Sequence, residues 1–346
     1  MSTMKRIVLC FFAFLFISCE SERNEKDVYM QKTFMFGSPA IVKVYGGTEQ
    51  QGKMIADAVL NEWNRISDEF NYEDPYSITS IINKRGTQEW VKADAEFLDL
   101  LQVAVDYNRF TEGSFDITFA PLWPLWKEAA SKRKLPSKKE IRQALSNIGS
   151  ENIEIDHAEH AVRLKKQVEI NLGGLLKGYC FERAYKLLEQ ANRYNLPVEL
   201  HLGGNMMAYR GKGWSYQMKN PVTGRKMGRF VFDQGAVISS SGGDGFVEID
   251  GEKYSHLLDL KTGYPIKNFS SFTVYFPDFG KENYLSSAAL AVMGREKAFG
   301  VLSGMKGSAA IWIDAEGEPY YFINEDSKAR WEAKKGFLET LFQRFQ

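Results

Sequence analysis

The sequence is poor in cysteine, and this limits how its fold can be stabilised. Only three cysteines occur in 346 residues, and Cys10 and Cys19 both lie close to the N-terminus. If that stretch is processed as described below, Cys180 is the one thiol left in the folded part, so no intramolecular disulfide can form there. Stability must then come from a hydrophobic core, for which 44% hydrophobic and 14% aromatic residues are sufficient.

The sequence also lacks an excess of charge of either sign. It has 44 Lys and Arg residues against 44 Asp and Glu residues, and removal of Lys5 and Arg6 would leave 42 against 44. A balance so close to neutral argues against nucleic acid, or an anionic membrane surface, as the main partner. We therefore predict a protein that binds no nucleic acid.

Long hydrophobic runs are missing except near the N-terminus. The unbroken apolar run Ile7 to Ile17 follows Lys5 and Arg6 and is too short to span a bilayer, as is typical of a signal peptide. Ser18 directly precedes Cys19, which is the pattern of a bacterial lipobox that leaves the cysteine as a lipidated N-terminus. An ordinary signal peptide with an incidental cysteine is the alternative.

These N-terminal features predict the organisation of the chain. Residues 1–18 are expected to be a lipoprotein signal peptide, residues 19–29 a polar tether and residues 30–346 the folded domain. The expected location is the bacterial cell envelope, with the protein lipid-anchored through Cys19 on the periplasmic or outer side.

Hydrophobic periodicity predicts a mixture of helices and strands. Apolar residues at three- and four-residue spacing predict helices over residues 51–70 and 94–109, and an amphipathic helix after residue 179. A capping box at Ser137 predicts a helix over residues 141–148. Predicted strands cover residues 152–156, 168–172, 198–202, 229–239, 246–249, 271–276 and 309–313. The irregular alternation predicts an α+β, or mixed α/β, fold and not a doubly wound sheet.

Two six-residue segments repeat one another thirty residues apart. Glu169–Gly174 and Glu199–Gly204 match at four of six positions, and each is predicted as a strand that runs into a glycine pair. They can mark two strand ends where bare backbone approaches a ligand, or two ordinary glycine turns in one sheet. The glycines alone do not separate these interpretations.

Three further segments carry polar groups in suggestive patterns. In Thr111–Leu122, Gly113 ends a helix and Asp116 offers a carboxylate, although a capped turn would need no more. In Leu172–Tyr179, two glycines precede a helix that carries Lys177 in its first turn. This arrangement suits a phosphate but lacks the spacing of a Walker A loop.

The third segment is Tyr254–Pro265, in which His256 is predicted on a strand. The Thr262–Gly263 turn follows it, so an imidazole would lie beside a polar loop. A single histidine of this kind is more often a structural hydrogen-bond donor than a catalyst.

Taken together, these segments resemble the ApbE family of flavin transferases from about residue 30 to residue 325. Five family motifs occur in order, at Phe36–Ser38, Thr111–Leu122, Asn171–Gly178, Gly203–Asn205 and His256–Gly263. The resemblance implies a flavin-transferase-like fold, with sheets flanked by helices and a ligand cleft between lobes.

The resemblance also implies an activity and a site. FAD would be the substrate, Mg²⁺ the metal, and FMN would pass to a Thr or Ser hydroxyl of a partner protein with release of AMP; other members hydrolyse FAD to FMN and AMP. His256 would be the catalytic general base or phosphate partner. The residues implied to contact the flavin nucleotide are Phe36, Tyr72, Ser114, Phe115, Asp116, Lys177, Gly203, Gly204 and Thr262. Of the metal ligands, the backbone carbonyl maps to Gly174, and Asn283 and Ser287 keep the four-residue spacing of the other two one position earlier, as neutral ligands.

The chain departs from the family pattern where charge binds metal and pyrophosphate. Tyr284 and Ala288 stand at the family's Asp and Thr metal ligands, and neither offers the hard oxygen that Mg²⁺ prefers. Asn171, Asn205 and Glu73 also replace the usual Asp, Asp and flavin-contacting Tyr. Three readings follow: a transferase with altered metal ligation, an FAD-binding or FAD-hydrolysing paralogue without transferase activity, and a scaffold that binds no flavin.

Overall fold

An eight-stranded antiparallel sheet organises the molecule, and its computed structural model describes residues 28–242, 246–280 and 287–334. In spatial order its strands are β1 (Val28–Met35), β2 (Ser38–Tyr45), β6 (Val198–Leu202), β7 (Asn205–Tyr209), β10 (Gly235–Ser241), β13 (Ser271–Phe276), β14 (Ala309–Ile313) and β15 (Pro319–Ile323). Strands far apart in sequence, such as β2 and β6, are direct neighbours. The sheet therefore brings together turns that the sequence separates.

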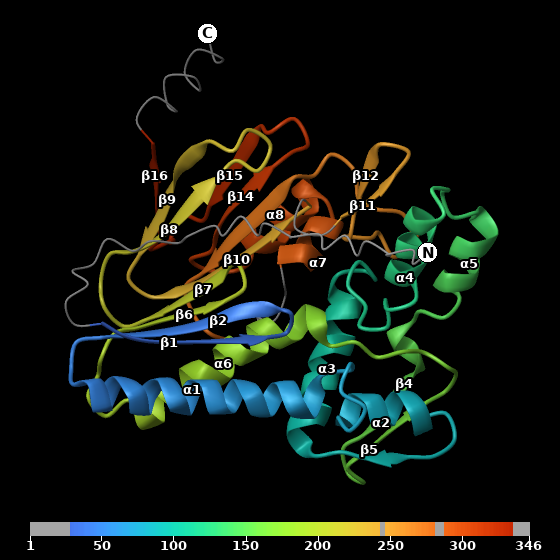
Figure 1. Cartoon of the computed structure of the whole chain (residues 1–346), viewed down its shortest axis with the longest axis horizontal. Helices are drawn as coiled ribbons and strands as arrows, with labels where there is room; N and C mark the ends of the chain where they lie inside the picture. The colour runs from blue at the N-terminus through green and yellow to red at the C-terminus, as the bar shows by residue number, and fades with distance from the viewer. Residues whose placement is uncertain (1–27, 243–245, 281–286, 335–346) are drawn as a thin grey trace, which may run out of the picture.

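Helices α1 (Glu49–Phe70) and α6 (Gly173–Ala191) pack below this sheet (Figure 1). A capping box at Thr48 begins α1, and its apolar stripe, which includes Val59 and Trp63, is fully buried. Trp63 also donates from Nε1 to the Cys180 carbonyl of α6 at 2.7 Å. The main hydrophobic core lies between these two helices and the sheet.

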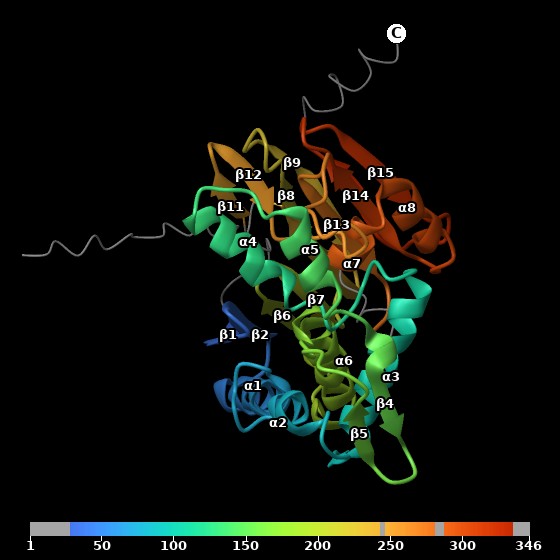
Figure 2. The same ribbon diagram turned by 90° about the vertical axis from the view of Figure 1, so that its right-hand side faces the viewer.

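The opposite face of the sheet carries a second core. A three-stranded sheet of β8 (Trp214–Lys219), β9 (Lys226–Phe232) and β16 (Arg330–Ala333) covers it, with Trp214, Phe230 and Phe232 buried between the layers. In Figure 2 the sheet that contains β8 and β9 lies above the large sheet, and α1 and α6 lie below it. The α+β architecture that the sequence predicts is confirmed.

The remaining elements lie mostly at one end of the molecule in Figure 1, whereas the last two helices lie nearer its centre. They are α2 (Ile78–Arg85), β3 (Val91–Lys92), α3 (Ala95–Phe110), α4 (Leu122–Ser131), α5 (Lys138–Leu145), β4 (Ile153–Asp156), β5 (Ala161–Leu164), β11 (Phe246–Ile249), β12 (Glu252–Ser255), α7 (Ser287–Val292) and α8 (Arg295–Ser303). A third, smaller core joins α4 and α5 to β11 through Trp126 and Ile249. Within the described residues, none of the helices combines the length and apolar character that crossing a membrane requires.

Several predicted elements match the structure. The helices predicted at 51–70 and 94–109 are α1 and α3, and the Ser137 capping box forms as expected at the start of α5. The strands predicted at 198–202, 246–249, 271–276 and 309–313 are β6, β11, β13 and β14 with the same bounds. In these segments the hydrophobic pattern of the sequence agrees with the burial of the side chains in the structure.

Other predictions are wrong for identifiable reasons. Residues 168–172 form no strand, because the Ile170 backbone bonds to the Asn83 side chain, with both bonds between 2.7 and 2.9 Å. The run 229–239 is two strands in different sheets, β9 and β10, separated by a turn that ends at Gly235 with φ +132°. Strand β1 includes Val28 and Tyr29, which the sequence analysis places at the end of the tether.

Candidate functional site

The N-terminal turn of α6 is the centre of the candidate site. Gly173 is the first helical residue, so both glycines lie within the first turn of α6. The sequence analysis had placed them before the helix. Asn171 Oδ1 accepts the Gly173 N–H at 2.9 Å. A Cβ on Gly174 would lie 3.0 Å from Phe115 Cε2, so the absence of a side chain lets α6 approach this ring.

Lys177 lies one turn further along α6 and reaches two other motifs. Its Nζ donates to Ser38 Oγ at 3.3 Å, and a Cβ on Gly203 would lie 3.3 Å from the same Nζ. Phe36 and Gly37 both have positive φ in the two-residue turn before Ser38, and the Gly203 turn has φ +63°. Residues 36–38, 177 and 203, predicted from separate motifs, therefore meet at one place.

The Gly203–Gly204 turn joins β6 to β7 in the centre of the sheet. Gly203 N–H donates to the Pro39 carbonyl at 2.9 Å, and the Gly204 carbonyl accepts from the Tyr216 hydroxyl at 2.7 Å. Asn205 Oδ1 accepts the Ser239 N–H at 3.0 Å. This turn is thus fixed to β2, β8 and β10 at once, which makes its position rigid.

Asp116 is buried and acts as the hydrogen-bond centre of its segment. Its carboxylate accepts from Asn108 Nδ2, from the backbone N–H and hydroxyl of Thr118, and from the backbone N–H and hydroxyl of Ser150, all between 2.6 and 3.0 Å. The carboxylate thereby holds the chain at Phe115 next to residue 150. Ser114, which is half-buried, precedes this tightly held region.

His256 lies just after β12 and not within a strand, which corrects the sequence prediction. Its ring meets the Trp123 ring edge to face, with centroids 6.1 Å apart. Thr262 Oγ1 donates to Asp259 Oδ2 at 2.9 Å within a turn that Asp259 also closes through its own backbone carbonyl. Trp126 Nε1 donates to the Gly263 carbonyl at 3.0 Å, so α4 supports this loop.

A cavity of about 320 Å³ connects the segment of Asp116 with the His256 loop. Its lining includes Gly113 and Asp116 on one side and Leu260 and Lys261 on the other. The structure therefore brings the predicted residues into two groups, one around α6 and one around the 256–263 loop, with the 111–122 segment between them.

Tyr72 belongs to the group around α6. It follows α1 in the loop that leads to α2, and burial together with the neighbouring Glu73 carboxylate raises the pKa of its phenol. A hydrogen bond to Asn171 acts in the opposite direction. The phenol of Tyr72 thus lies next to the residue that caps the first turn of α6.

Comparison with known proteins adds a decisive observation. The sequence profile of the ApbE family matches residues 36–312. This chain belongs to the ApbE family. The matched range contains all five motifs and both groups of site residues, so family membership and the geometry refer to the same part of the molecule.

Relatives and solved structures agree with that assignment. A FAD:protein FMN transferase of Haemophilus influenzae is 30% identical over 236 residues, which cover 64% of this chain and 67% of the relative. One of Klebsiella pneumoniae is 24% identical over 294 residues, 84% of this chain and 90% of the relative. The ApbE protein of Thermotoga maritima has a TM-score of 0.76 at 27% identity, covering 86% of this chain and 97% of that one. The apo form of the Pseudomonas stutzeri flavinyl transferase ApbE has a TM-score of 0.68 at 19% identity and shares the fold.

The candidate metal ligands offer a poor donor set. Ser287 begins α7, is fully buried and shares a 2.7 Å hydrogen bond with the Ser240 hydroxyl. Asn283, like Tyr284, falls outside the residues that the structure describes. Within the described part, no three His, Cys, Asp or Glu side chains come together as a metal cluster would require. Gly174 and Ser287 by themselves provide only neutral oxygens.

One polar cluster near this site was missed by the sequence reasoning. Ser239 and Ser240 lie near the end of β10. The Ser239 hydroxyl shares a 2.8 Å hydrogen bond with Thr273, and the Ser240 hydroxyl bonds to Ser287. Since Asn205 also bonds to Ser239, the cluster borders the Gly203–Gly204 turn. The run of three serines before two glycines at 239–243 was the available signal.

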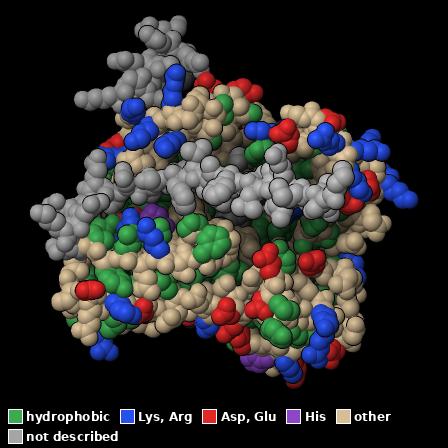
Figure 3. Space-filling view, viewed as in Figure 1, with side chains coloured by type: hydrophobic (Ala, Val, Ile, Leu, Met, Phe, Trp, Pro, Cys, Tyr) green, Lys and Arg blue, Asp and Glu red, His purple; other side chains and the backbone are tan. Residues whose placement is uncertain are grey.

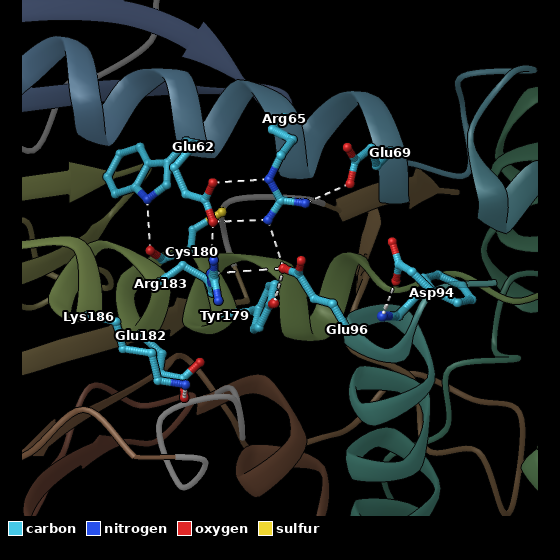
Figure 4. A network of polar contacts seen from close by, with 12 residues as sticks. Glu62, Arg65, Glu69, Asp94, Glu96, Tyr179, Cys180, Glu182, Arg183 and Lys186 are labelled. Carbon is cyan, nitrogen blue, oxygen red and sulfur yellow. Dashed lines mark hydrogen bonds and ion pairs between the residues drawn. The ribbon is translucent and has the colours of Figure 1, made fainter. Parts of the chain in front are cut away.

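A network of ion pairs holds α6 in place away from the site (Figure 4). Arg65 of α1 contacts Glu62 at 2.9 Å and Glu96 of α3 at 2.7 Å, and Arg183 of α6 contacts Glu62 at 2.7 Å. Tyr179 donates to Glu96. The hydrogen bond from Arg65 lowers the pKa of Glu62, so the network is ionised at neutral pH. It locks together the three helices whose ends carry Tyr72, Ser114 and Lys177.

Proposed function

We propose that this protein transfers FMN from FAD to a Thr or Ser hydroxyl of an exported partner protein and releases AMP. Its relatives are named FAD:protein FMN transferases, and they match most of the folded domain. The observation that carries the proposal is the convergence of Lys177, Ser38 and Gly203 beside the first turn of α6. A helix N-terminus with an ammonium group and a rigid glycine turn suits a pyrophosphate.

In the proposed reaction each group has a defined task. The acceptor hydroxyl oxygen attacks the phosphorus of the FMN half, a new P–O bond forms, and the P–O bond to the AMP half breaks. Lys177 offsets the negative charge of the phosphates. His256 accepts the proton of the hydroxyl, a task that an imidazole side chain can perform. The half-buried Tyr72 provides aromatic surface for the nucleotide, whereas Phe115 is buried in the main core.

Mg²⁺ does not fit well with the protein groups that are present. The ion prefers at least one carboxylate in octahedral oxygen coordination, whereas Gly174, Ser287 and Asn283 are all neutral. We therefore assign no step to a protein-held metal. An FAD-binding or FAD-hydrolysing paralogue without transferase activity is the second candidate, and the Tyr284 and Ala288 replacements are the observation that favours it.

The test is turnover of FAD by the full-length protein. With FAD and Mg²⁺ we expect AMP to appear by chromatography, slowly or only at high Mg²⁺. FAD binding without AMP would favour the binding paralogue, and no binding at all would leave a scaffold. Changing Tyr284→Asp together with Ala288→Thr should raise turnover, because it restores a carboxylate and a hydroxyl at the four-residue spacing of the family pattern. Full activity at ordinary Mg²⁺ with no gain from this pair would reject the idea of a weakened metal site.

The contribution of Lys177 can be measured separately. Charge-assisted contacts are worth about 1.5–3 kcal/mol, so Lys177→Met should weaken FAD affinity roughly ten- to a hundredfold. Lys186→Met is the matched control, since Lys186 lies on the same helix and pairs with Glu182 at 2.6 Å. An unchanged dissociation constant in folded Lys177→Met would remove this residue from the site.

The proposed location is the cell envelope, with the lipid on Cys19 as the anchor. The basic residues, apolar run and small residue before the cysteine support it. Cys19→Ala should move the protein from the membrane fraction to the soluble fraction. A variant that still fractionates with membranes would contradict lipid anchoring at this position.

A further inference from the structure

One surface of this nearly neutral protein is strongly basic. We define the basic hairpin as residues 122–145, the helices α4 and α5 with their connection. Between residues 127 and 143 it contains seven Lys and Arg residues and two Glu residues, whereas the whole chain is balanced at 44 and 44. All seven basic side chains are exposed. Figure 3 shows Lys and Arg side chains gathered at this end of the molecule.

The two acidic residues of the hairpin are already engaged within it. Glu128 pairs with Lys132 at 2.5 Å, and the Glu140 carboxylate accepts the Ser137 N–H at 2.7 Å in the capping box of α5. The remaining positive charges face solvent. A concentration of one sign on a rigid element attracts a partner of the opposite sign and raises the rate of encounter.

The hairpin also forms an apolar groove between its helices. A cavity of about 890 Å³ lies there, with Leu125, Ala129 and Pro136 in its lining. Three lysines, Lys132, Lys134 and Lys139, also line it, together with the two engaged carboxylates of Glu128 and Glu140. Leu135 lies at the same cavity with 48% of its surface exposed. Apolar floor and basic rim together suit a polypeptide segment that combines an apolar side chain with several carboxylates.

The position of the hairpin links it to the proposed chemistry. Trp126 of α4 donates to the Gly263 carbonyl, and Trp123 packs against the His256 ring. Gly263 has no room for a side chain, because a Cβ there would lie 2.5 Å from Ile141 of α5. A segment bound to the hairpin is therefore held next to the loop that carries the proposed base.

We propose that the basic hairpin docks an acidic segment of the acceptor protein, and so selects acceptors whose Thr or Ser lies near carboxylates. This inference rests on the proposed transferase function. It commits to a polypeptide partner, since a groove with an apolar floor favours side chains over lipid headgroups. Binding of an anionic lipid, or electrostatic attraction of FAD, would be a different function for the basic side chains of the hairpin.

The experiment measures binding of two synthetic peptides to the full-length protein by fluorescence anisotropy. Both have the same length, one Thr and one Leu; one carries Asp and Glu around the Thr, and the other carries Asn and Gln. We expect the acidic peptide to bind at least roughly tenfold more tightly. The triple change Lys134→Glu, Lys138→Glu and Lys139→Glu should abolish that preference. A control triple reverses three exposed lysines elsewhere, Lys226, Lys306 and Lys328, and should keep it.

The outcomes separate docking from transfer. Equal binding of both peptides, or no effect of the hairpin triple, would overturn the inference. So would a loss of FAD affinity in that variant with peptide binding unchanged, or binding of phosphatidylglycerol vesicles in place of the peptide. FMN incorporation into the Thr is followed independently by mass spectrometry. Tight charge-dependent binding without FMN incorporation would support docking and count against the transferase function. FMN incorporation that does not depend on the charge of the peptide would support the transferase function and count against docking.

Discussion

The two repeated segments, Glu169–Gly174 and Glu199–Gly204, have nearly the same sequence and quite different structures. The first is irregular and leads into α6, with Glu169 exposed to solvent. The second is a fully buried strand, β6, with Glu199 inside the molecule. Each glycine pair nevertheless borders Lys177 or its helix. Two short segments of nearly the same sequence can therefore adopt different backbone structures, because the pattern by itself leaves that structure undetermined.

The buried glutamate of the second segment has partners that the first lacks. Lys43 contacts Glu199 at 3.2 Å from the neighbouring strand β2, and Tyr45 and His201 also bond to it. Burial by itself would raise the pKa of Glu199, but the hydrogen bond and charge of His201, followed by Lys43, lower it to about 2. The Glu199 carboxylate can therefore stabilise β6 only because Lys43 and His201 lie in contact with it.

Removing this charge should have the largest effect on stability. Glu199→Ala leaves Lys43 and His201 without their counter-ion in a buried place, and should lower the free energy of unfolding by about 3–5 kcal/mol. Glu169→Ala is the control, with an expected change within about 0.5 kcal/mol because this side chain is exposed. Urea unfolding measures both. Similar losses in the two variants would contradict the contrast drawn between the segments.

The same carboxylate predicts a pH dependence of stability. Its pKa is lowered from 4.5 to about 2 in the folded protein, so its contribution is complete above pH 4.5 and is lost as the pH falls towards 2. Across this range the free energy of unfolding should drop by about 3 kcal/mol on account of this group. Glu199→Gln should flatten that part of the curve. A wild-type profile that the substitution leaves unchanged would assign the acid sensitivity to other carboxylates.

The irregular form of the first segment depends on Asn83. Its side chain both accepts from Ile170 N–H at 2.7 Å and donates to the Ile170 carbonyl at 2.9 Å, which replaces the ladder of a strand. Asn83→Ala should cost about 1–3 kcal/mol, because two backbone groups lose their partners. Thermal or urea unfolding tests this, with Asn147→Ala as an exposed control. Faster hydrogen exchange at Ile170 would locate the effect.

The two glycines of the second pair should differ from each other. Gly203 has φ +63°, and a Cβ there would press on Ser38 Oγ and Lys177 Nζ at 3.2 and 3.3 Å. Gly203→Ala should therefore cost about 1–2 kcal/mol and also weaken FAD binding. Gly204→Ala meets open space and should be close to neutral in stability. Unfolding and FAD titration of the pair check this, and equal behaviour of the two variants would argue against a special role for Gly203.

Much of the candidate site could be predicted from the sequence because its motifs are local. The helix that carries Lys177, the turn at Thr262–Gly263 and the segment around Asp116 are each contiguous, and family resemblance supplied their order. The sequence could not show that the Asp116 carboxylate accepts hydrogen bonds from Thr118 and Ser150, since residue 150 is distant in the chain. It also could not reveal that Ser239 borders Asn205, because that contact needs β7 and β10 to be neighbours.

The sequence by itself determined the periodic elements, the neutral charge balance, the basic stretch at 127–143 and the family motifs. These properties are written in residue type and spacing, which act over a few residues. Tertiary structure alone decided which of the two repeated segments became a strand, and it decided which glutamate was buried. The reason is physical: backbone and carboxylate groups take the partners that the fold brings to them, and here those partners are Asn83 in one case and Lys43 with His201 in the other.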